Sequence, residues 1–457
     1  MIFNKYSRFT SNVLIIFFLT ICISSCKQIG SDDSNSLEVS ASPNGGTYNA
    51  PQLVTLTANQ QSTIYYTMNG ENPTSSSLVY TKPIGINSSI TLKFFAIDNK
   101  TNSSNIKEEP YIISWDILPT KIYSTINYNT TDLKIIADSQ NIINAVWQHY
   151  LDSADIFYSN STNWETQTIK INTGNRPDFA LDSDNVIHLV FTDNTVPWIN
   201  VAYYSNSINW ENRIDISKGK YSLVVTASPK IAMDSNKLAH VVWEDTVRMG
   251  NHIYDDGIFY CDSSSWASPK IIFQTSFEIY SPLIFVDSKN IKHIIWGNST
   301  TNNVNVSELL VEIRYANSSN WNNYTVISRN SPWGYNHQAM AVDKNNCVHV
   351  AWEEGKTNNI YYANSLDWTK QINVSGPDSY QPKIAVDKNN IVHLVWGYSP
   401  DRLRYDIYYA NSLNWTNNMK IFSNASSCPQ LAVDLNNIVH VAWETYNDGV
   451  VTLYIKP

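Results

Sequence analysis

Stretches in which apolar and polar residues alternate cover most of this chain. One of them, residues 391–396, reads IVHLVW and follows the residues PKIAVDKNN. Alternation with a period of two predicts β-strands buried on one face, and the polar interval between two such strands predicts a tight turn. An Asn in this turn tolerates the left-handed backbone that Gly usually supplies. The pattern therefore predicts an all-β chain built from hairpins.

The same hairpin recurs roughly every 50 residues from residue 115 onward. Its Asp is found at Asp138, Asp182, Asp234, Asp287, Asp343, Asp387 and Asp434. After the second strand come a variable loop, a third strand such as DIYYANS and a fourth strand, which we expect to start at a second Trp. Four short strands per unit predict the blade of a β-propeller, and seven copies predict seven blades over residues 115–457.

The last unit ends after VTLYIKP and has no fourth strand of its own. Residues 120–126 resemble a fourth strand and precede the first unit. We therefore expect strand 120–126 to close the last blade, which would remove two exposed sheet edges.

One position of the second strand carries a His in six units, and it raises the question of chemistry. These residues are His188, His240, His293, His349, His393 and His440, with Asn144 in the first unit. A catalytic group does not need six copies around a ring, so we interpret the His and the Asp before the turn as structural. Twelve of the 15 Trp also occupy repeat positions; Trp115, Trp198 and Trp333 do not.

The repeat resembles that of bacterial sialidase-like propellers with BNR-type repeats. The resemblance covers residues 116–457 and implies a propeller on which glycosidase activity is one option. Two departures limit it. The turn of that family, S-x-D-x-G-x-T-W, is shortened here to forms such as ANSLNW at residues 410–415, and the Arg residues form no evident triad.

Residues 37–114 predict a separate, small β-sandwich. The segment PNGGTY at residues 43–48, the segment IYYTMNG at 64–70 and the strand at 92–98 resemble the Ig-like module at the C-terminus of chitobiases and β-hexosaminidases. The resemblance implies a spacer or an accessory binding unit.

The N-terminal residues predict export. Lys5 and Arg8 precede a short apolar stretch that ends in Ile23-Ser24-Ser25-Cys26, which resembles a bacterial lipobox. We expect residues 1–25 to be a lipoprotein signal peptide, Cys26 to carry lipid, and residues 26–36 to be a flexible tether at the cell envelope or cell surface. An ordinary signal peptide is the alternative.

Composition narrows the function classes. The net charge is −9 and no basic run occurs, so nucleic acid is not an expected partner. Cys261, Cys347 and Cys428 lack metal-type spacing, and we expect free, mostly buried thiols, no metal and no cofactor.

Function is expected where the repeat is broken, in the loops that share one face of the propeller. The candidate ligand-binding residues there are Arg176, Trp198, Glu244, Arg248, Trp333, His337, Glu353, Tyr380 and Arg402. Rings, carboxylates and Arg together suit a glycan or an extracellular protein. The sequence favours a non-catalytic, membrane-anchored binding protein. A sialidase-like exo-glycosidase acting on extracellular glycans, with carboxylates such as Glu244, Glu353 and Glu444, is the alternative, and a plain scaffold is a third.

Overall fold

The structure is a computed structural model in which every regular element among the described residues is a β-strand, as the sequence predicts. The described residues are 36–48, 52–86, 89–113, 119–126, 130–150, 154–164, 166, 168–196, 199–217, 228–249, 253–301, 309–330, 337–355, 357–416, 418–447 and 450–456. A helix long and apolar enough to cross a membrane is absent from these ranges. The predicted signal peptide and Cys26 lie outside them.

The N-terminal part forms two small sheets. The three-stranded sheet has the order β1 (Val39–Ser42), β3 (Gln52–Ala58), β6 (Ile84–Ile86). The five-stranded sheet has the order β2 (Gly46–Tyr48), β8 (Lys107–Ile113), β7 (Ile90–Asp98), β4 (Ser62–Thr67), β5 (Leu78–Val79). Their alternating apolar residues, such as Val54, Leu92 and Phe94, are buried together.

The rest of the described chain forms seven four-stranded antiparallel sheets. The first three are β10 (Thr130–Ala137), β11 (Ile143–Tyr150), β12 (Ala154–Asn160), β13 (Ile169–Thr173); β14 (Asn175–Leu181), β15 (Ile187–Val196), β16 (Ile199–Asn206), β17 (Asn209–Asp215); and β18 (Lys230–Met233), β19 (Ala239–Met249), β20 (Ile253–Asp262), β21 (Lys270–Thr275). The next three are β22 (Ile279–Val286), β23 (Lys292–Thr301), β24 (Leu309–Asn317), β25 (Thr325–Asn330); β26 (Gln338–Val342), β27 (Val348–Glu354), β28 (Asn359–Asn364), β29 (Ile372–Asn373); and β30 (Ser379–Val386), β31 (Val392–Tyr398), β32 (Tyr405–Asn411), β33 (Met419–Ala425). The seventh is β34 (Gln430–Val433), β35 (Val439–Asn447), β36 (Val450–Lys456), β9 (Thr120–Ile126).

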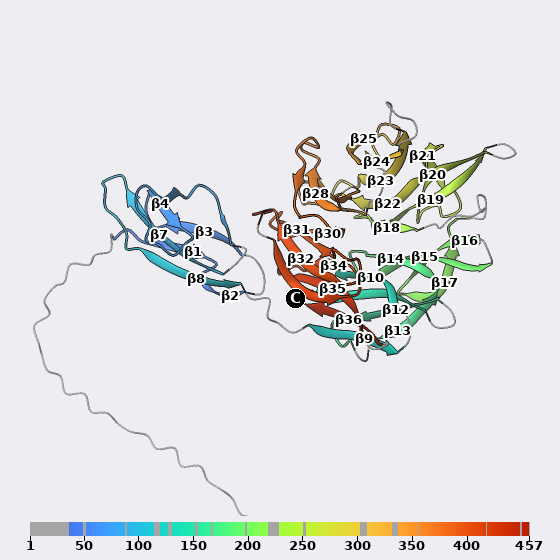
Figure 1. Cartoon of the computed structure of the whole chain (residues 1–457), viewed down its shortest axis with the longest axis horizontal. Helices are drawn as coiled ribbons and strands as arrows, with labels where there is room; N and C mark the ends of the chain where they lie inside the picture. Colours follow the sequence, from blue (N-terminus) through green and yellow to red (C-terminus); the bar gives the residue numbers. More distant parts are fainter. Residues whose placement is uncertain are drawn as a thin grey trace, which may run out of the picture.

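The seven sheets are arranged in a closed ring. The first strand of each sheet contacts the first strand of the next, and β34 contacts β10. Figure 1 shows these first strands around the centre, with β9, β13, β17 and β25 toward the rim. The seventh sheet contains both ends of the ring, because β9 pairs antiparallel with β36, with Thr125 opposite Val451.

The repeated Asp holds the turn between the first two strands of each sheet. In all seven turns its Oδ1 accepts hydrogen bonds from two backbone N–H groups, as Asp138 does from Gln140 and Ile142 at 2.8 Å. The residue three positions after the Asp has a φ of 60–63° in every turn. It is Asn in six turns, such as Asn141, and Lys237 in the third. Asn is common there because its short polar side chain tolerates this conformation.

In five of the six units that carry it, the repeated His lies between this Asp and a Tyr of the third strand. Nδ1 of His188, for example, is 2.7 Å from the Tyr204 hydroxyl, and its Nε2 is 3.4 Å from Asp182 Oδ2. In the first sheet Asn144 Oδ1 accepts the same hydrogen bond from the Tyr158 hydroxyl at 2.7 Å. His440 contacts Asp434, and Ile455 stands at the position of that Tyr in β36. The structural interpretation of the His is therefore confirmed.

The repeated aromatic residues of the second strands form the core between sheets. These are Trp147, Phe191, Trp243, Trp296, Trp352, Trp396 and Trp443, and all are fully or almost fully buried. The three thiols are free and buried, as predicted.

Two predicted boundaries are wrong. The fourth strand does not start at its Trp in most sheets: β13 begins at Ile169 after Trp164, and β33 begins at Met419 after Trp415. The second strands are also longer than expected, so that Glu244 and Arg248 belong to β19 and Glu353 belongs to β27, and not to loops. The ladder extends because the third strand continues to pair there, up to Met249 opposite Ile253. Likewise, Arg176 and Tyr380 lie in the first strands β14 and β30 and not in loops.

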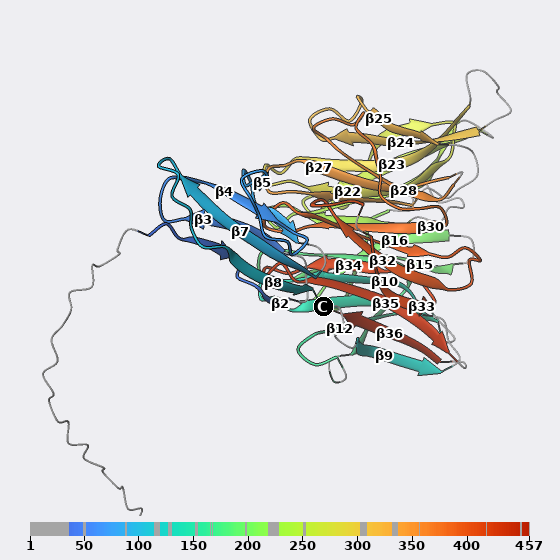
Figure 2. The same cartoon turned by 60° about the vertical axis from the view of Figure 1, so that its left-hand side comes forward.

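The small sheets pack against the ring at the sixth sheet. Their buried side chains and those of the sixth and seventh sheets form one continuous cluster. Gly85 of β6 lies directly against Leu413, in the turn after β32, so that a Cβ at Gly85 would be 2.6 Å from the Leu413 Cβ. Figure 2 shows β1–β8 beside the ring. The turn that holds Leu413 lies at the same end of the sheet as the Asp turns, opposite the loops between units.

Candidate functional site

The first strands carry a bulge near the end that faces the loops between units. Asp132, Arg176, Ser281 and Gln381 each stand six residues before a repeat Asp and have φ values of 45–56°. At each of them the pairing register shifts against the second strand. An extra residue of this kind bends the strand and redirects side chains, so it shapes the entrance of the central channel.

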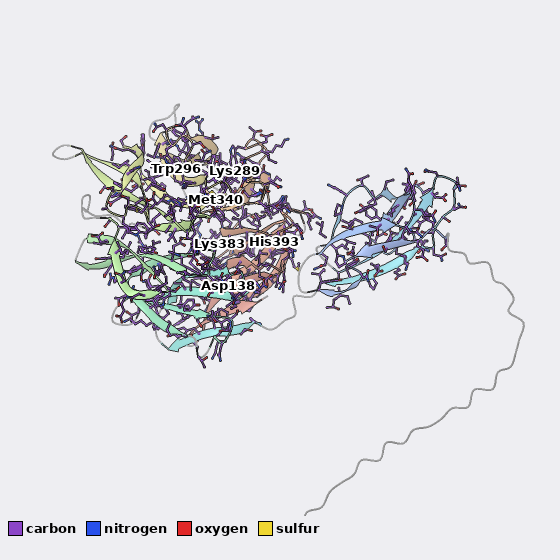
Figure 3. The ribbon with its side chains drawn as sticks, turned by 180° about the vertical axis from the view of Figure 1, so that it is seen from behind. Asp138, Lys289, Trp296, Met340, Lys383 and His393 are labelled. Atoms are coloured by element: carbon purple, nitrogen blue, oxygen red, sulfur yellow. The ribbon has the colours of Figure 1, made fainter. Side chains whose placement is uncertain are left out.

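Two residues further along, the first strands place charged side chains in the channel. The residues at this position are Lys134, Asp178, Lys230, Leu283, Ala339, Lys383 and Gln430. Lys134 Nζ is 4.0 Å from Asp178 Oδ1, and Asp178 Oδ2 accepts a hydrogen bond from the Ile231 backbone N–H at 3.1 Å. We refer to Lys134, Lys230 and Lys383 as the lysine tier. Figure 3 labels Lys383, toward the middle of the ring.

Beyond the lysine tier the channel is apolar. A cavity of about 530 Å³ runs along the first strands. The residues two positions after the tier line it: Ile136, Ala180, Ala232, Phe285, Ala341, Ala385 and Ala432. Because strand residues two apart point to the same side, the tier and this apolar section share one channel.

On the other side of the tier, a pocket of about 600 Å³ opens at the channel mouth. Four sheets contribute to it, through Asp132, Arg176, Ser228, Glu244, Asp245, Asp256, Glu278, Ile279, Tyr280 and Ser281. We call it the mouth pocket. Its lining combines carboxyl groups, one guanidinium, hydroxyls and one aromatic ring.

Burial changes the protonation of the acidic residues at the mouth. It raises the pKa of Glu244 to about 7 even though Lys230 and Arg176 oppose the shift, and it raises the pKa of Asp245 to about 7. Burial and the neighbouring Asp132 raise the pKa of Glu444, in β35, to about 8. Near neutral pH a substantial fraction of each side chain is therefore an uncharged acid, which can donate a hydrogen bond.

A second group of predicted residues meets between the fifth and sixth sheets. Glu353 Oε2 is 3.1 Å from His337 Nδ1 and accepts the Gln381 backbone N–H at 3.2 Å. Arg402 Nε donates to the Tyr380 hydroxyl at 3.2 Å, and its guanidinium carbon lies 5.3 Å from the centre of that ring. Glu353 is only 4% exposed, so its contacts hold two sheets together instead of facing solvent.

The structure thus brings the predicted residues into two groups. Arg176 and Glu244 share the mouth pocket, and His337, Glu353, Tyr380 and Arg402 form the second group. Arg248 lies in β19, beyond Glu244. Trp198 and Trp333 lie outside the described residues, as does Cys26.

The lysine tier was missed by the sequence analysis. The signal was available in the aligned first strands, where Lys134, Lys230 and Lys383 stand four residues before the repeat Asp. A Lys in a strand that otherwise alternates like its neighbours suggests an exposed edge, and only the closed ring shows that the position faces a channel.

One group of possible metal ligands is present among the described side chains, namely Asp343, Cys347 and His349. Asp343 and His349 are the repeat residues, and Asp343 Oδ1 already accepts two turn N–H groups. Cys347 occupies a position that is Ile391 in the next unit. The group is therefore explained by the repeat, with a thiol in place of an aliphatic side chain.

Residues 43–108 match the family model of the chitobiase/beta-hexosaminidase C-terminal domain. This match bears out the resemblance found for that segment and covers no part of the ring. The comparison with curated proteins gives no match.

Several solved structures are similar to the chain at low identity. An oligogalacturonate lyase in complex with manganese has 8% identity and a TM-score of 0.46, over 73% of this chain and 99% of the lyase. An ulvan lyase has 9% identity and a TM-score of 0.46, over 74% of this chain and 96% of that one. The α-L-arabinanase of Penicillium chrysogenum, complexed with arabinobiose, has 9% identity and a TM-score of 0.42, over 66% of this chain and 99% of the enzyme.

Proposed function

We propose that this chain is an exported lipoprotein, anchored through Cys26, that binds a glycan at the channel mouth without turning it over. In this proposal the seven sheets are the blades of a seven-bladed β-propeller of the sialidase-like, BNR-repeat type, and the two small sheets are an Ig-like β-sandwich. An extracellular protein is the other ligand class that the sequence leaves open.

The observation that carries this proposal is the mouth pocket. Its volume of about 600 Å³ falls within the range of small-ligand sites, and residues of four different sheets converge on it. Loops or strand ends from several units that meet around one pocket are typical of binding sites supported by a rigid scaffold.

The chemistry of the lining favours hydroxyl-rich ligands. A protonated Glu244 or Asp245 can donate a hydrogen bond, Asp132 can accept one, and Arg176 donates in a fixed geometry. Sugar hydroxyls both donate and accept, so they can satisfy these groups together. The Tyr280 ring offers an apolar surface at the same pocket.

A sialidase-like exo-glycosidase remains the second candidate, because one observation favours it. Glu244, with a pKa of about 7, is suited to act as a general acid, and Asp256 lines the same pocket. A glycosidase needs such a pair of carboxyl groups.

The test is a glycan array followed by a turnover assay on every glycan that binds, with the full chain and with Glu244→Gln. The proposal predicts binding without hydrolysis, and a modest change of affinity in the variant. Hydrolysis that falls by orders of magnitude in Glu244→Gln, while binding persists, would establish the glycosidase instead. If no glycan binds, the proposed function is wrong.

Anchoring is tested separately. Cys26→Ser should leave an unlipidated precursor that no longer partitions into the detergent phase as the parent chain does. Unchanged partitioning of this variant would contradict the lipid site.

A further inference from the structure

The lysine tier concentrates positive charge in a narrow part of the channel. Lys134, Lys230 and Lys383 occupy the same register position on three first strands that surround one channel. They stand four residues from the Asp turns, which is about 13 Å along a strand, and therefore just inside the mouth pocket.

The described carboxyl groups balance this charge only in part: Asp178, Glu244 and Asp132 attract Lys230 and oppose the lowering of its pKa by burial. Asp178 is the one carboxylate at the same register position, and it is shared between Lys134, at 4.0 Å, and the backbone N–H of Ile231. Lys230 Nζ donates to two neutral oxygens, Ser228 Oγ at 2.9 Å and Pro229 O at 3.3 Å. For Lys383 Nζ, no hydrogen bond or ion pair is found among the described side chains.

The surroundings make an uncompensated ammonium group costly. Burial lowers the pKa of Lys383 to about 8, and repulsion from Lys134 and then Lys230 adds to the effect, while Cys428 and Asp132 oppose it. On the inner side, the Ala-rich section of the channel offers no polar partner. Charges of one sign in a low-dielectric channel focus their potential on whatever enters it.

We propose that the lysine tier binds the carboxylate or sulfate group of an acidic saccharide whose remaining sugar residues lie in the mouth pocket. This inference rests on the proposed glycan-binding function and specifies the class of glycan. The anion supplies an acceptor to Lys383 and adds a charged acceptor beside the two neutral ones of Lys230. Ammonium–carboxylate or ammonium–sulfate hydrogen bonds are among the stronger polar contacts in proteins.

The acidic lining of the mouth pocket is compatible with such a ligand. Glu244 of this lining has a raised pKa, as has Glu444 of β35, which interacts with Asp132 of the lining but is not part of it. In the protonated form both can present O–H donors, so they do not exclude an anion as ionised carboxylates would. Asp132, Asp256 and Glu278 add further carboxyl groups to the rim. A saccharide with a single acidic group at one end can place that group at the lysine tier and its neutral sugars at the rim. An acidic peptide fits less well, because it would place further carboxylates against the rim.

The experiment compares matched ligands and matched variants of the full chain, purified in mild detergent. The ligands are an acidic glycan identified on an array of acidic and neutral glycans, and the same glycan after carboxyl reduction or desulfation. Inorganic sulfate and an oligoglutamate peptide are tested beside them. The variants are Lys383→Met, Lys383→Arg and Lys230→Met, with Lys289→Met as the control because Lys289 is exposed in the turn after β22.

We expect the acidic glycan to bind and its neutral counterpart to bind at least about tenfold more weakly, which corresponds to one charged hydrogen bond. Lys383→Met and Lys230→Met should each lose about tenfold in affinity for the acidic glycan, while Lys383→Arg and Lys289→Met should bind within a few-fold of the parent.

The outcomes separate the two proposals. Neutral glycans that bind as well as acidic ones, or an acidic glycan whose affinity is unaffected by the Lys→Met variants, would overturn the anion site and leave the glycan-binding function standing. Sulfate or oligoglutamate binding at the tier without any glycan would overturn the saccharide as occupant. If no ligand of any kind binds, both proposals are wrong.

Discussion

At the scale of single residues, the His between Asp and Tyr has the geometry of a structural contact. His393 Nδ1 is 2.7 Å from the Tyr409 hydroxyl, and its Nε2 is 3.7 Å from Asp387 Oδ2. Burial lowers the pKa of the equivalent His188, His240, His293, His349 and His440, which favours the neutral ring. A neutral ring fits a role in which one nitrogen donates and the other accepts.

His393→Asn should therefore be tolerated, because Asn144 already makes the hydrogen bond to Tyr158 in the first sheet. We expect the free energy of unfolding to fall by about 1–2 kcal/mol and glycan binding to be unchanged. Urea unfolding and the array measure the two effects. Loss of binding in a variant that is still folded would show that the His is functional.

Lys383 makes the opposite prediction, because burial works against its charged form. Its folded pKa of about 8 lies below the ordinary value of 10.5, so the folded chain binds fewer protons than the unfolded chain between these values. The free energy of unfolding should therefore rise as the pH increases from about 8 to about 10.5. Below pH 8 the charged group destabilises the fold, by about 1–3 kcal/mol after allowance for water in the channel.

Lys383→Met should thus raise the melting temperature at pH 7 and change it little at pH 10.5. Thermal unfolding at the two values, with Lys289→Met beside it, measures this. If Lys383→Met instead lowered the melting temperature equally at pH 7 and pH 10.5, the aliphatic part of Lys383 would matter more for stability than its charge. A residue that lowers the stability of the fold but strengthens ligand binding is typical of a functional position.

The repeat residues could be predicted from the sequence because each recurs in a fixed local context. The Asp, the Asn of positive φ, the His and the Trp all act within their own unit or against the next one. The lysine tier depends on something that no single unit contains. Only closure of the ring brings Lys134, Lys230 and Lys383 close together. A bulge, such as the one at Gln381 just before Lys383, also changes the direction of the first strand.

At the scale of elements, the strand β9 is the one whose position in sequence differs from its position in space. It belongs to the seventh sheet, and its Ile122 packs with Leu133, Trp147 and Ala442 in a cluster that joins the seventh sheet to the first. Tyr123 adds a ring contact with Trp147, at 5.3 Å between centroids.

Replacing residues 120–126 by a Gly–Ser segment of equal length should open the ring while keeping the connection to the small sheets. The edge of β36 would lose its partner, and we expect aggregation or a large loss of thermal stability. Ile122→Ala is the milder variant and should cost about 2–4 kcal/mol. Melting and light scattering measure both. A Gly–Ser variant that melts like the parent chain would contradict the role of β9.

The boundaries of the elements were harder to predict than their order. In most units the second Trp marks a turn and not the start of the fourth strand, because a hydrogen-bonded turn such as Asn411 to Asn414 precedes it. Trp210, which lies within β17, is the exception. The extension of β19 to Met249 depends on pairing with β20, and the residues between Trp243 and Ile253 do not alternate in a way that reveals it. Tertiary pairing decides such boundaries.

At the scale of the whole molecule, the contact between Gly85 and Leu413 determines which way the channel mouth faces. Leu413 lies at the end of its sheet that is opposite the mouth, so the small sheets leave the mouth free. Residues at the equivalent turn position in other units, Ile208 and Leu366, are 77% and 82% exposed, whereas Leu413 is partly covered. The mouth therefore lies on the side of the ring away from the small sheets, which follow the proposed anchor in the sequence.

Gly85→Val should separate the two parts of the chain, because its Cβ would lie 2.6 Å from Leu413 Cβ and 2.8 Å from Leu413 Cδ1, distances that no packed side chain adopts. We expect a single calorimetric transition in the parent chain to divide into two in the variant, and proteolysis between Ile113 and Thr120 to become faster.

Gly376→Ala is the matched control, since a Cβ at Gly376 meets no atom within 4 Å. Leu413→Gly combined with Gly85→Val should restore part of the coupling, because it also removes the Leu413 Cβ that lies 2.6 Å from the new side chain, as expected for two residues in direct contact. Glycan binding should persist in all three variants, because the contact is remote from the mouth pocket. A Gly85→Val chain that unfolds and is cleaved like the parent would show that the small sheets are not held at Leu413, and the orientation argued here would then fail.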